Sequence, residues 1–117
     1  MEQSKFKELI VWQKSMDLVD DVYALLRGFP KSEAFGLGDQ MRRAVVSIPS
    51  NIAEGYGRGS RKDYAHFLQI ARGSVYEIMT QLNIAARQGF ISDITSVESL
   101  AVDVARILNS MISRLSS

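Results

Sequence analysis

Residues 61–88 read RKDYAHFLQIARGSVYEIMTQLNIAARQ, and no other segment of the chain has a clearer periodicity. Apolar side chains recur at intervals of three and four residues, which places them on one helical face through about seven turns. Ser60 and Asp63 form a capping-box-like pair at the start of this segment, and Gly89 follows its end. The pattern predicts one long amphipathic helix. Its apolar face comprises Tyr64, Phe67, Leu68, Ala71, Val75, Ile78, Met79, Leu82, Ala85 and Ala86.

The preceding segment, residues 37–54, has the same helical period. Met41, Val45, Ile48 and Ile52 form its apolar face. Pro49 lies inside this pattern, and because proline removes an intrahelical hydrogen bond we expect a kink or local irregularity there. We expect the glycine-rich run over residues 55–59 to break the chain before the next helix.

Two further helices are predicted at about residues 8–27 and 93–115. The first ends at Gly28 and Pro30, and the second has a capping box formed by Thr95 and Glu98. The main stripe of the first helix is Leu9, Trp12, Met16, Val19, Tyr23 and Leu26, with an adjoining stripe of Val11, Leu18, Val22 and Leu25. The buried stripe of the last helix is Val97, Ala101, Val104, Leu108, Met111 and Leu115.

Four amphipathic segments joined by short connections favour antiparallel neighbours. No segment shows a sustained alternation of apolar and polar residues, so no strand is predicted. The sequence therefore predicts a single all-α domain over residues 1–117, an up-down-up-down antiparallel four-helix bundle. The apolar surfaces of the first and last helices are wider than one bundle needs, which indicates a homo-oligomer.

Composition excludes several classes of function. The 117 residues contain 14 Lys and Arg, 13 Asp and Glu, one His and no Cys, for a net charge of +1. Without cysteine there is no disulfide, thiol catalysis or thiolate metal site, and one histidine makes a multi-histidine metal site impossible. No catalytic residue, metal ligand or cofactor is predicted. The chain shows neither a signal-peptide core nor a membrane-spanning apolar run, so we expect a cytoplasmic, soluble protein.

A stripe of polar residues on the segment 37–54 is open to three interpretations. Arg43, Ser47, Asn51 and Glu54 are spaced by four, four and three residues, and Ser74 and Glu77 form a matching stripe on the segment 61–88. The stripe is either a solvated outer face or a structural polar network between helices or subunits, with an ion pair between Arg43 and Glu77. The third and weakest interpretation pairs Glu54 and Glu77 as the acid and base of a hydrolase.

Positive charge is concentrated in residues 42–72, whose net charge is +4. Arg58, Arg61 and Lys62 lie in or next to the glycine-rich loop, where free N–H groups at the start of the next helix also favour an anion. They are candidate phosphate contacts, with Arg42 or Arg72 contributing if these side chains face the same rim. The alternative is a flexible turn with incidental charges.

These residues, in this order, resemble the four-helix-bundle proteins encoded in intervening sequences of 23S ribosomal RNA genes, also labelled S23 ribosomal proteins. The accessory variability protein of diversity-generating retroelements is similar in the same way. The resemblance extends from about residue 6 to 115, and its most specific element is SIPSNIAEG at residues 47–55. Its other elements are Leu9-x-x-Trp12-Gln13-Lys14, Tyr23, Phe29-Pro30-x-x-Glu33, Gly36-Leu37, Gln40-x-x-Arg43-Ala44, Ala71-x-x-Ser74-x-x-Glu77 and Gln81-Leu82.

The resemblance implies a bundle that assembles into a ring of five copies, with no known enzymatic activity. For the retroelement relatives it implies binding to nucleic acid and to a reverse transcriptase. We therefore predict a non-catalytic homo-oligomeric adaptor, a pentamer, that binds structured RNA weakly through Arg58, Arg61 and Lys62. The alternative is a structural scaffold whose partner is a protein.

Overall fold

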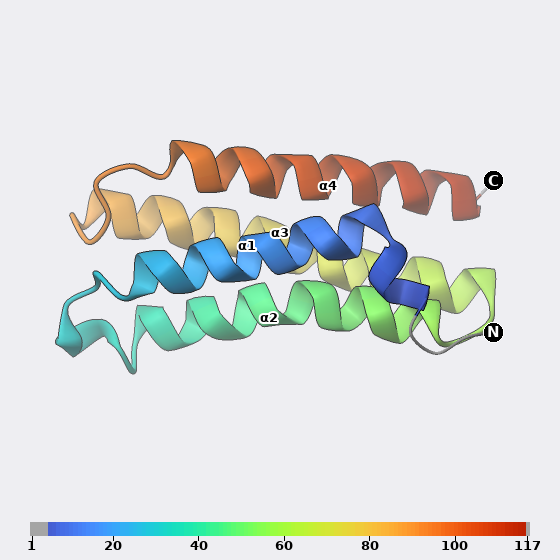
Figure 1. The fold of residues 1–117 in the computed structure, drawn as a ribbon, viewed down its shortest axis with the longest axis horizontal. Coiled ribbons are helices and arrows are strands. Elements are labelled where there is room, and N and C mark those ends of the chain that lie inside the picture. Colours follow the sequence, from blue (N-terminus) through green and yellow to red (C-terminus); the bar gives the residue numbers. More distant parts are fainter. Residues whose placement is uncertain (1–4, 117) are drawn as a thin grey trace.

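The computed structural model describes residues 5–116, and over this range the chain forms four α-helices and no strand (Figure 1). The predicted all-α class is confirmed. Two short 3-10 helices, η1 (Lys5–Glu8) and η2 (Lys31–Glu33), flank the first α-helix. The α-helices are α1 (Ile10–Leu26), α2 (Leu37–Tyr56), α3 (Arg61–Arg87) and α4 (Thr95–Ser116).

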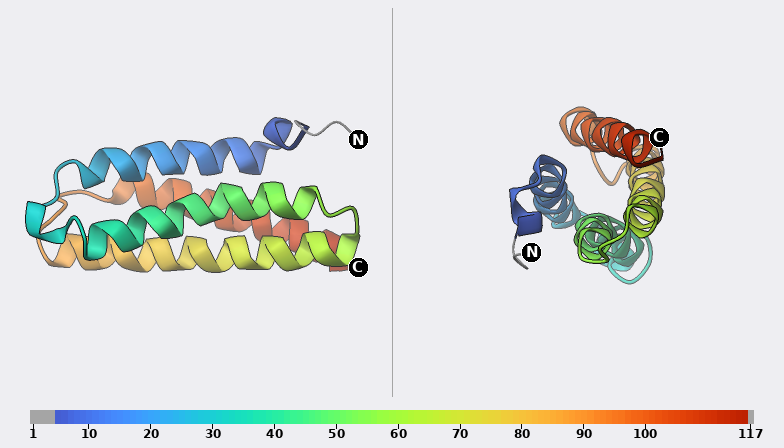
Figure 2. Two further views of the ribbon diagram at one scale, coloured as in Figure 1. Left: turned by 90° about the horizontal axis from the view of Figure 1, so that it is seen from below. Right: turned by 90° about the vertical axis from the view of Figure 1, so that its right-hand side faces the viewer.

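Successive helices run in opposite directions, so the predicted up-down-up-down bundle is confirmed (Figure 2). Each helix packs against its neighbours in sequence, and α1 closes the bundle by packing against α4. Helices α1 and α3 are diagonal, and the residues described in them make no contact with each other. The bundle is a rod of 44 × 24 × 20 Å. The α2–α3 connection and the ends of α1 and α4 nearest the termini lie at one end of this rod.

The faces predicted for α2 and α3 form the centre of the core. Met41, Val45, Ile48 and Ile52 of α2 are all completely buried. They face a row of α3 side chains with no exposed surface, namely Leu68, Ala71, Val75, Ile78, Leu82 and Ala85. The helical period in the sequence was sufficient to identify both faces, because each helix has one apolar stripe of ordinary width.

The face predicted for α1 is wrong by about a quarter of a turn. The residues that enter the core belong to the adjoining stripe, while Met16 and Tyr23 of the predicted main stripe are each 37% exposed. The bundle turns the side of α1 that carries Ser15 inward, and the Ser15 hydroxyl is satisfied by donating to the Val11 carbonyl oxygen at 2.6 Å. The buried residues of α1 are Val11, Ser15, Leu18, Val22 and Leu26.

Gly55 does not break the chain, contrary to the prediction, because α2 continues to Tyr56. A Cβ atom at Gly55 would lie 2.7 Å from Phe67 Cβ and 3.3 Å from the Tyr64 carbonyl oxygen of α3. Glycine is therefore present because α2 and α3 approach closely here. The helix also continues through the buried Pro49 without interruption.

The start of α3 is capped as the sequence predicts. The Ser60 side-chain oxygen accepts a hydrogen bond from the Asp63 backbone N–H at 3.1 Å. Because this bond satisfies one of the free N–H groups of the first turn, we expect Ser60→Ala to lower the free energy of unfolding by about 1 kcal/mol in urea denaturation. The exposed Ser110→Ala on α4 is the control and should change it by less than about 0.5 kcal/mol. Equal effects of the two substitutions would contradict the capping role.

The capping box predicted at Thr95 and Glu98 is wrong. Thr95 is the first residue of α4, and its N–H donates to the Asp93 carboxylate at 2.9 Å. This bond lowers the pKa of Asp93 below its usual value. Glu98 instead accepts a hydrogen bond from Asn83 of α3. Towards its end α4 also buries Ala105 and Ile112 in place of the predicted Met111 and Leu115, which are partly buried.

Candidate nucleic-acid interface

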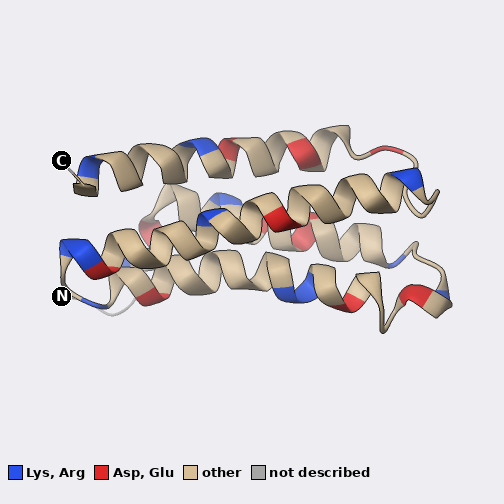
Figure 3. Ribbon diagram, turned by 180° about the vertical axis from the view of Figure 1, so that it is seen from behind, with Lys and Arg blue, Asp and Glu red and all other residues tan. Residues whose placement is uncertain are grey.

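The end of the rod where the α2–α3 connection lies carries most of the positive charge (Figure 3). Only Glu8, Glu54 and Asp63 oppose these cations, so this basic end has a net charge of +3. The antiparallel fold creates the cluster, because the start of α3, the end of α4 and η1 meet there. The cations of the basic end are Lys5, Lys7, Arg58, Arg61, Lys62 and Arg114.

A groove of about 510 Å³ opens between α3 and α4 at the basic end. Arg61, Lys62, His66 and Gln69 line it from α3, and the end of α4 lines the other side. Lys62, His66 and Gln69 are exposed, so their polar groups face solvent. Such a groove offers cationic and amide donors to a phosphate backbone, without a rigid arrangement for reading base edges.

The three predicted phosphate contacts differ in their availability. Lys62 has no hydrogen bond or ion pair with any other described residue. Arg61 donates to the Arg114 carbonyl oxygen at 2.7 Å and so satisfies the C-terminal end of α4. Arg58 pairs with Glu54 at 3.1 Å and its guanidinium lies 4.9 Å from the Phe67 ring centre. Both arginines are therefore positioned by the bundle, with their remaining N–H groups directed to solvent.

The other two arginines named from the sequence lie away from this cluster. Arg72 is about three turns along α3 from Arg61, on the side of α4, where its Nη1 donates to Asn109 at 2.9 Å. Arg42 is in the first turns of α2, roughly 20 Å from Arg58, and donates to the Ala34 carbonyl oxygen at 3.4 Å. The expectation that Arg42 shares the rim is wrong, because α2 carries it to the opposite end.

The predicted polar network between helices forms in part. The hydroxyls of Ser47 on α2 and Ser74 on α3 are 2.8 Å apart. Asn51 donates to the Ser47 hydroxyl at 3.0 Å and to the Ser47 carbonyl oxygen at 2.8 Å. These three side chains fix the α2–α3 register, as the structural interpretation predicts.

The charged members of the predicted network are elsewhere engaged. Arg43 pairs with Asp39 of its own helix at 3.1 Å, so the predicted ion pair between Arg43 and Glu77 is wrong. Glu77 accepts a long hydrogen bond, 3.4 Å, from the nearly buried Gln81, one turn further along α3. Both exposed arginine and glutamate side chains reach a partner on their own helix at lower entropic cost.

The geometry also separates the two carboxylates of the hydrolase alternative. With Ser47 opposite Ser74, position 54 of α2 faces position 67 of α3, where Gly55 meets Phe67. Glu77 is ten residues beyond, or about 15 Å along the helix axis. An acid and a base that act on one bond are separated by about 5–10 Å in glycoside hydrolases. Glu54 and Glu77 therefore do not form such a pair.

Sequence reasoning missed His66 and Arg114 as members of this surface. Their signal is positional: in an antiparallel α3–α4 pair the last turn of α4 must lie beside the first turns of α3. Tyr56 was a candidate base-stacking residue, but it packs edge-to-face on Tyr64 at 6.0 Å. Burial, followed by the proximity of Tyr56, raises the pKa of Tyr64.

The closed antiparallel arrangement, fixed by a serine pair and carrying its cations at one end, defines the class as a small four-helix-bundle protein. Within that class, the chain belongs to the 23S rRNA-intervening sequence protein family, whose family model matches residues 7–110. The family resemblance inferred from the sequence is thus confirmed. No helix in the described part of the chain has the length and apolar character required to traverse a membrane.

The fold is similar to a crystal structure from Bacteroides thetaiotaomicron VPI-5482, a protein with unknown function from the S23 ribosomal protein family. The TM-score is 0.81 with 24% sequence identity, over 88% of this chain and 98% of that chain. At this identity the similarity concerns the fold alone. No curated protein matches the chain.

Proposed function

We propose that this protein is a non-catalytic homo-oligomeric adaptor, a pentameric ring, that binds structured RNA weakly through its basic end. The observation that carries the RNA-binding proposal is the gathering of six cations against three acids at one end of a chain whose overall charge is only +1. Lys62 and the solvent-facing groups of Arg58 and Arg61 contact phosphates, and His66 and Gln69 lie beside them.

Ring symmetry supports binding by so modest a patch. One basic end with a net charge of +3 neutralises few phosphates, but several copies in one assembly present the patch repeatedly and convert weak contacts into avidity. Self-association is supported by the half-exposed stripe on α1, where Met16 and Tyr23 leave apolar surface uncovered. The number five comes from the family resemblance.

The triple variant Arg58→Ala/Arg61→Ala/Lys62→Ala tests the RNA site. We expect it to bind a labelled RNA hairpin about tenfold or more weakly at low salt in fluorescence anisotropy, because fewer phosphates are neutralised. Each phosphate contact that is lost releases fewer counterions, so the slope of log affinity against log salt should decrease by roughly 0.7–0.9 per contact.

A matched control removes the same charge from the opposite end of the rod. Arg27→Ala/Lys31→Ala/Arg87→Ala changes three exposed cations and should leave affinity and salt slope close to those of the wild type. Equal losses in the two variants would show that only net charge matters and would reject the basic end as the site. If the wild type does not bind at low salt, the RNA role is wrong and the protein-binding scaffold is favoured.

A further inference from the structure

Charge is divided unequally between two helices that do not touch. Helix α1 carries Lys14 against Asp17, Asp20 and Asp21, a net charge of −2. Helix α3 has a net charge of +2, whereas α2 and α4 are each neutral. Since α1 and α3 occupy diagonal corners and make no contact between their described residues, this complementarity is not used within one chain.

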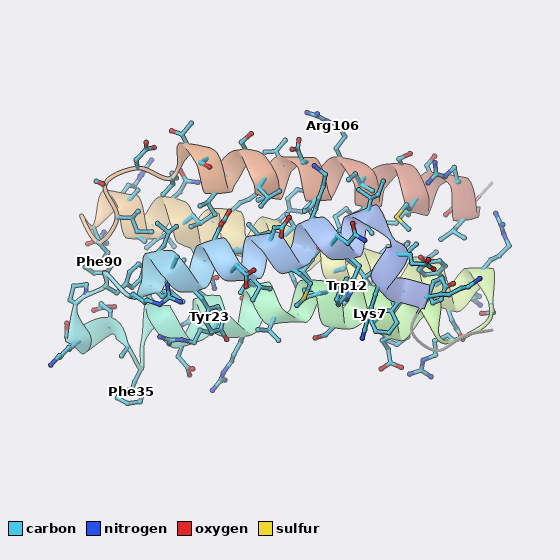
Figure 4. All side chains as sticks on the ribbon, viewed as in Figure 1. Lys7, Trp12, Tyr23, Phe35, Phe90 and Arg106 are labelled. Carbon is cyan, nitrogen blue, oxygen red and sulfur yellow. The ribbon has the colours of Figure 1, made fainter. Side chains whose placement is uncertain are left out.

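A shallow apolar groove lies between α1 and α2 beside the acidic side of α1. Trp12, Met16 and Val19 line it from α1, and Val46, Pro49 and Ala53 line it from α2, around a volume of about 250 Å³. Figure 4 shows Trp12 and Tyr23 on the side of α1 that faces α2. Met16 and Val46 remain 37% and 41% exposed, so apolar surface is left open along the groove.

The outward face of α3 is a second apolar surface, different from the first. Ile70, Tyr76 and Ile84 are 40–49% exposed there. With Gly73, Glu77 and Thr80, the two isoleucines follow the spacing of three and four residues that is typical of a helix-packing seam. A groove of about 530 Å³ lies beside this seam and is lined in part by Tyr76, Thr80 and Ile84.

Gly73 in this seam has no explanation within the chain. It lies in the middle of a 27-residue helix, where glycine is less favourable than alanine. A Cβ atom at this position would meet nothing within 4 Å, in contrast to Gly55, where the neighbouring helix is in contact. A close approach from outside the chain accounts for a glycine at an open helical position.

We propose that copies of this chain associate head to tail, with the α3 seam of one copy packed on the α1–α2 groove of the next. The proposal rests on the self-association proposed above and specifies its surfaces. The occupant is a second copy because both halves of the interface are present in one chain, apolar against apolar and basic α3 against acidic α1. Two different surfaces on diagonal helices form a heterologous contact, which yields a ring when the rotation closes.

Two single variants and their mixture test this arrangement. Val46→Glu disables the groove and Ile84→Glu disables the seam, and both positions are exposed enough for the monomer to fold. Each variant alone should scatter light as a 13.1 kDa monomer. An equimolar mixture should form a heterodimer of about 26 kDa and nothing larger, since it retains one intact groove and one intact seam that can meet. Ser110→Glu on the exposed side of α4 is the control and should assemble as the wild type does.

The outcomes separate this proposal from the proposed function. A monomeric wild type overturns self-association altogether. A wild-type oligomer that neither variant disrupts overturns these surfaces and leaves self-association standing. Variants that stay monomeric after mixing overturn the head-to-tail arrangement.

Gly73→Ala provides a second measurement that does not depend on a disruptive charge. We expect a higher midpoint of thermal unfolding for the monomer, because alanine favours the helix, together with association weakened about tenfold or more by the added methyl group. Unchanged association in this more stable variant would contradict a close approach at Gly73.

Discussion

Leu68→Ala is expected to lower the free energy of unfolding by about 2–5 kcal/mol, the largest effect of any single substitution considered. Leu68 is completely buried on α3, opposite the apolar face of α2. The loss combines the transfer free energy of the missing methyl groups with a cavity that the neighbouring helices fill only in part. Urea unfolding measures it as a lower midpoint at an unchanged slope.

The control for Leu68→Ala is Ile10→Ala, at a position that is 64% exposed. Its removal takes away little buried surface, and we expect a change below about 1 kcal/mol. A loss at Leu68 no larger than the loss at Ile10 would mean that the packing between α2 and α3 is not the centre of the core.

Gly55→Ala and Gly73→Ala are expected to change stability in opposite directions although both place alanine inside a helix. At Gly55 the added Cβ would lie 2.7 Å from Phe67 Cβ, so α2 and α3 must separate, at a cost of about 1–3 kcal/mol. At Gly73 the space is open and the gain in helix propensity, up to about 1 kcal/mol, is retained. Thermal unfolding of both variants at a concentration where the chain is monomeric measures the contrast.

Equal stabilisation by the two substitutions would show that α2 and α3 adjust to a methyl group at Gly55 without cost. The comparison is well controlled because the chemical change is identical. Only the neighbourhood of the Cβ atom differs.

The sequence predicts a helix reliably where one stripe of apolar residues has one possible neighbour. This condition holds for α2 and α3, whose buried faces were identified correctly from Met41 to Ile52 and from Leu68 to Ala85. It does not hold for α1, because the stripes that contain Trp12 and Leu18 are both apolar and periodicity alone does not select between them. The choice depends on where α2 and α4 lie, which is tertiary information.

The candidate site divides along the same line. A short connection between α2 and α3 ensures that Arg58, Arg61 and Lys62 stay close together, so the sequence was sufficient to group them. Arg114 joins this group only through the packing of α4, 53 residues further along the chain. The partner of Arg43 was also out of reach, since Asp39 on its own helix competes with Glu77 on another.

The nearest-neighbour packing of the bundle has a consequence for how the chain acquires its structure. Helices α2 and α3 adjoin through a four-residue connection, so their mutual contacts close short loops and form early. The pairing of α1 with α4 is the one contact that joins the two ends of the chain. During synthesis α1 emerges first, yet it must wait for the last helix before its packing is complete. Until then its apolar stripes are exposed, and a hairpin of α2 and α3 is the only surface available to cover them.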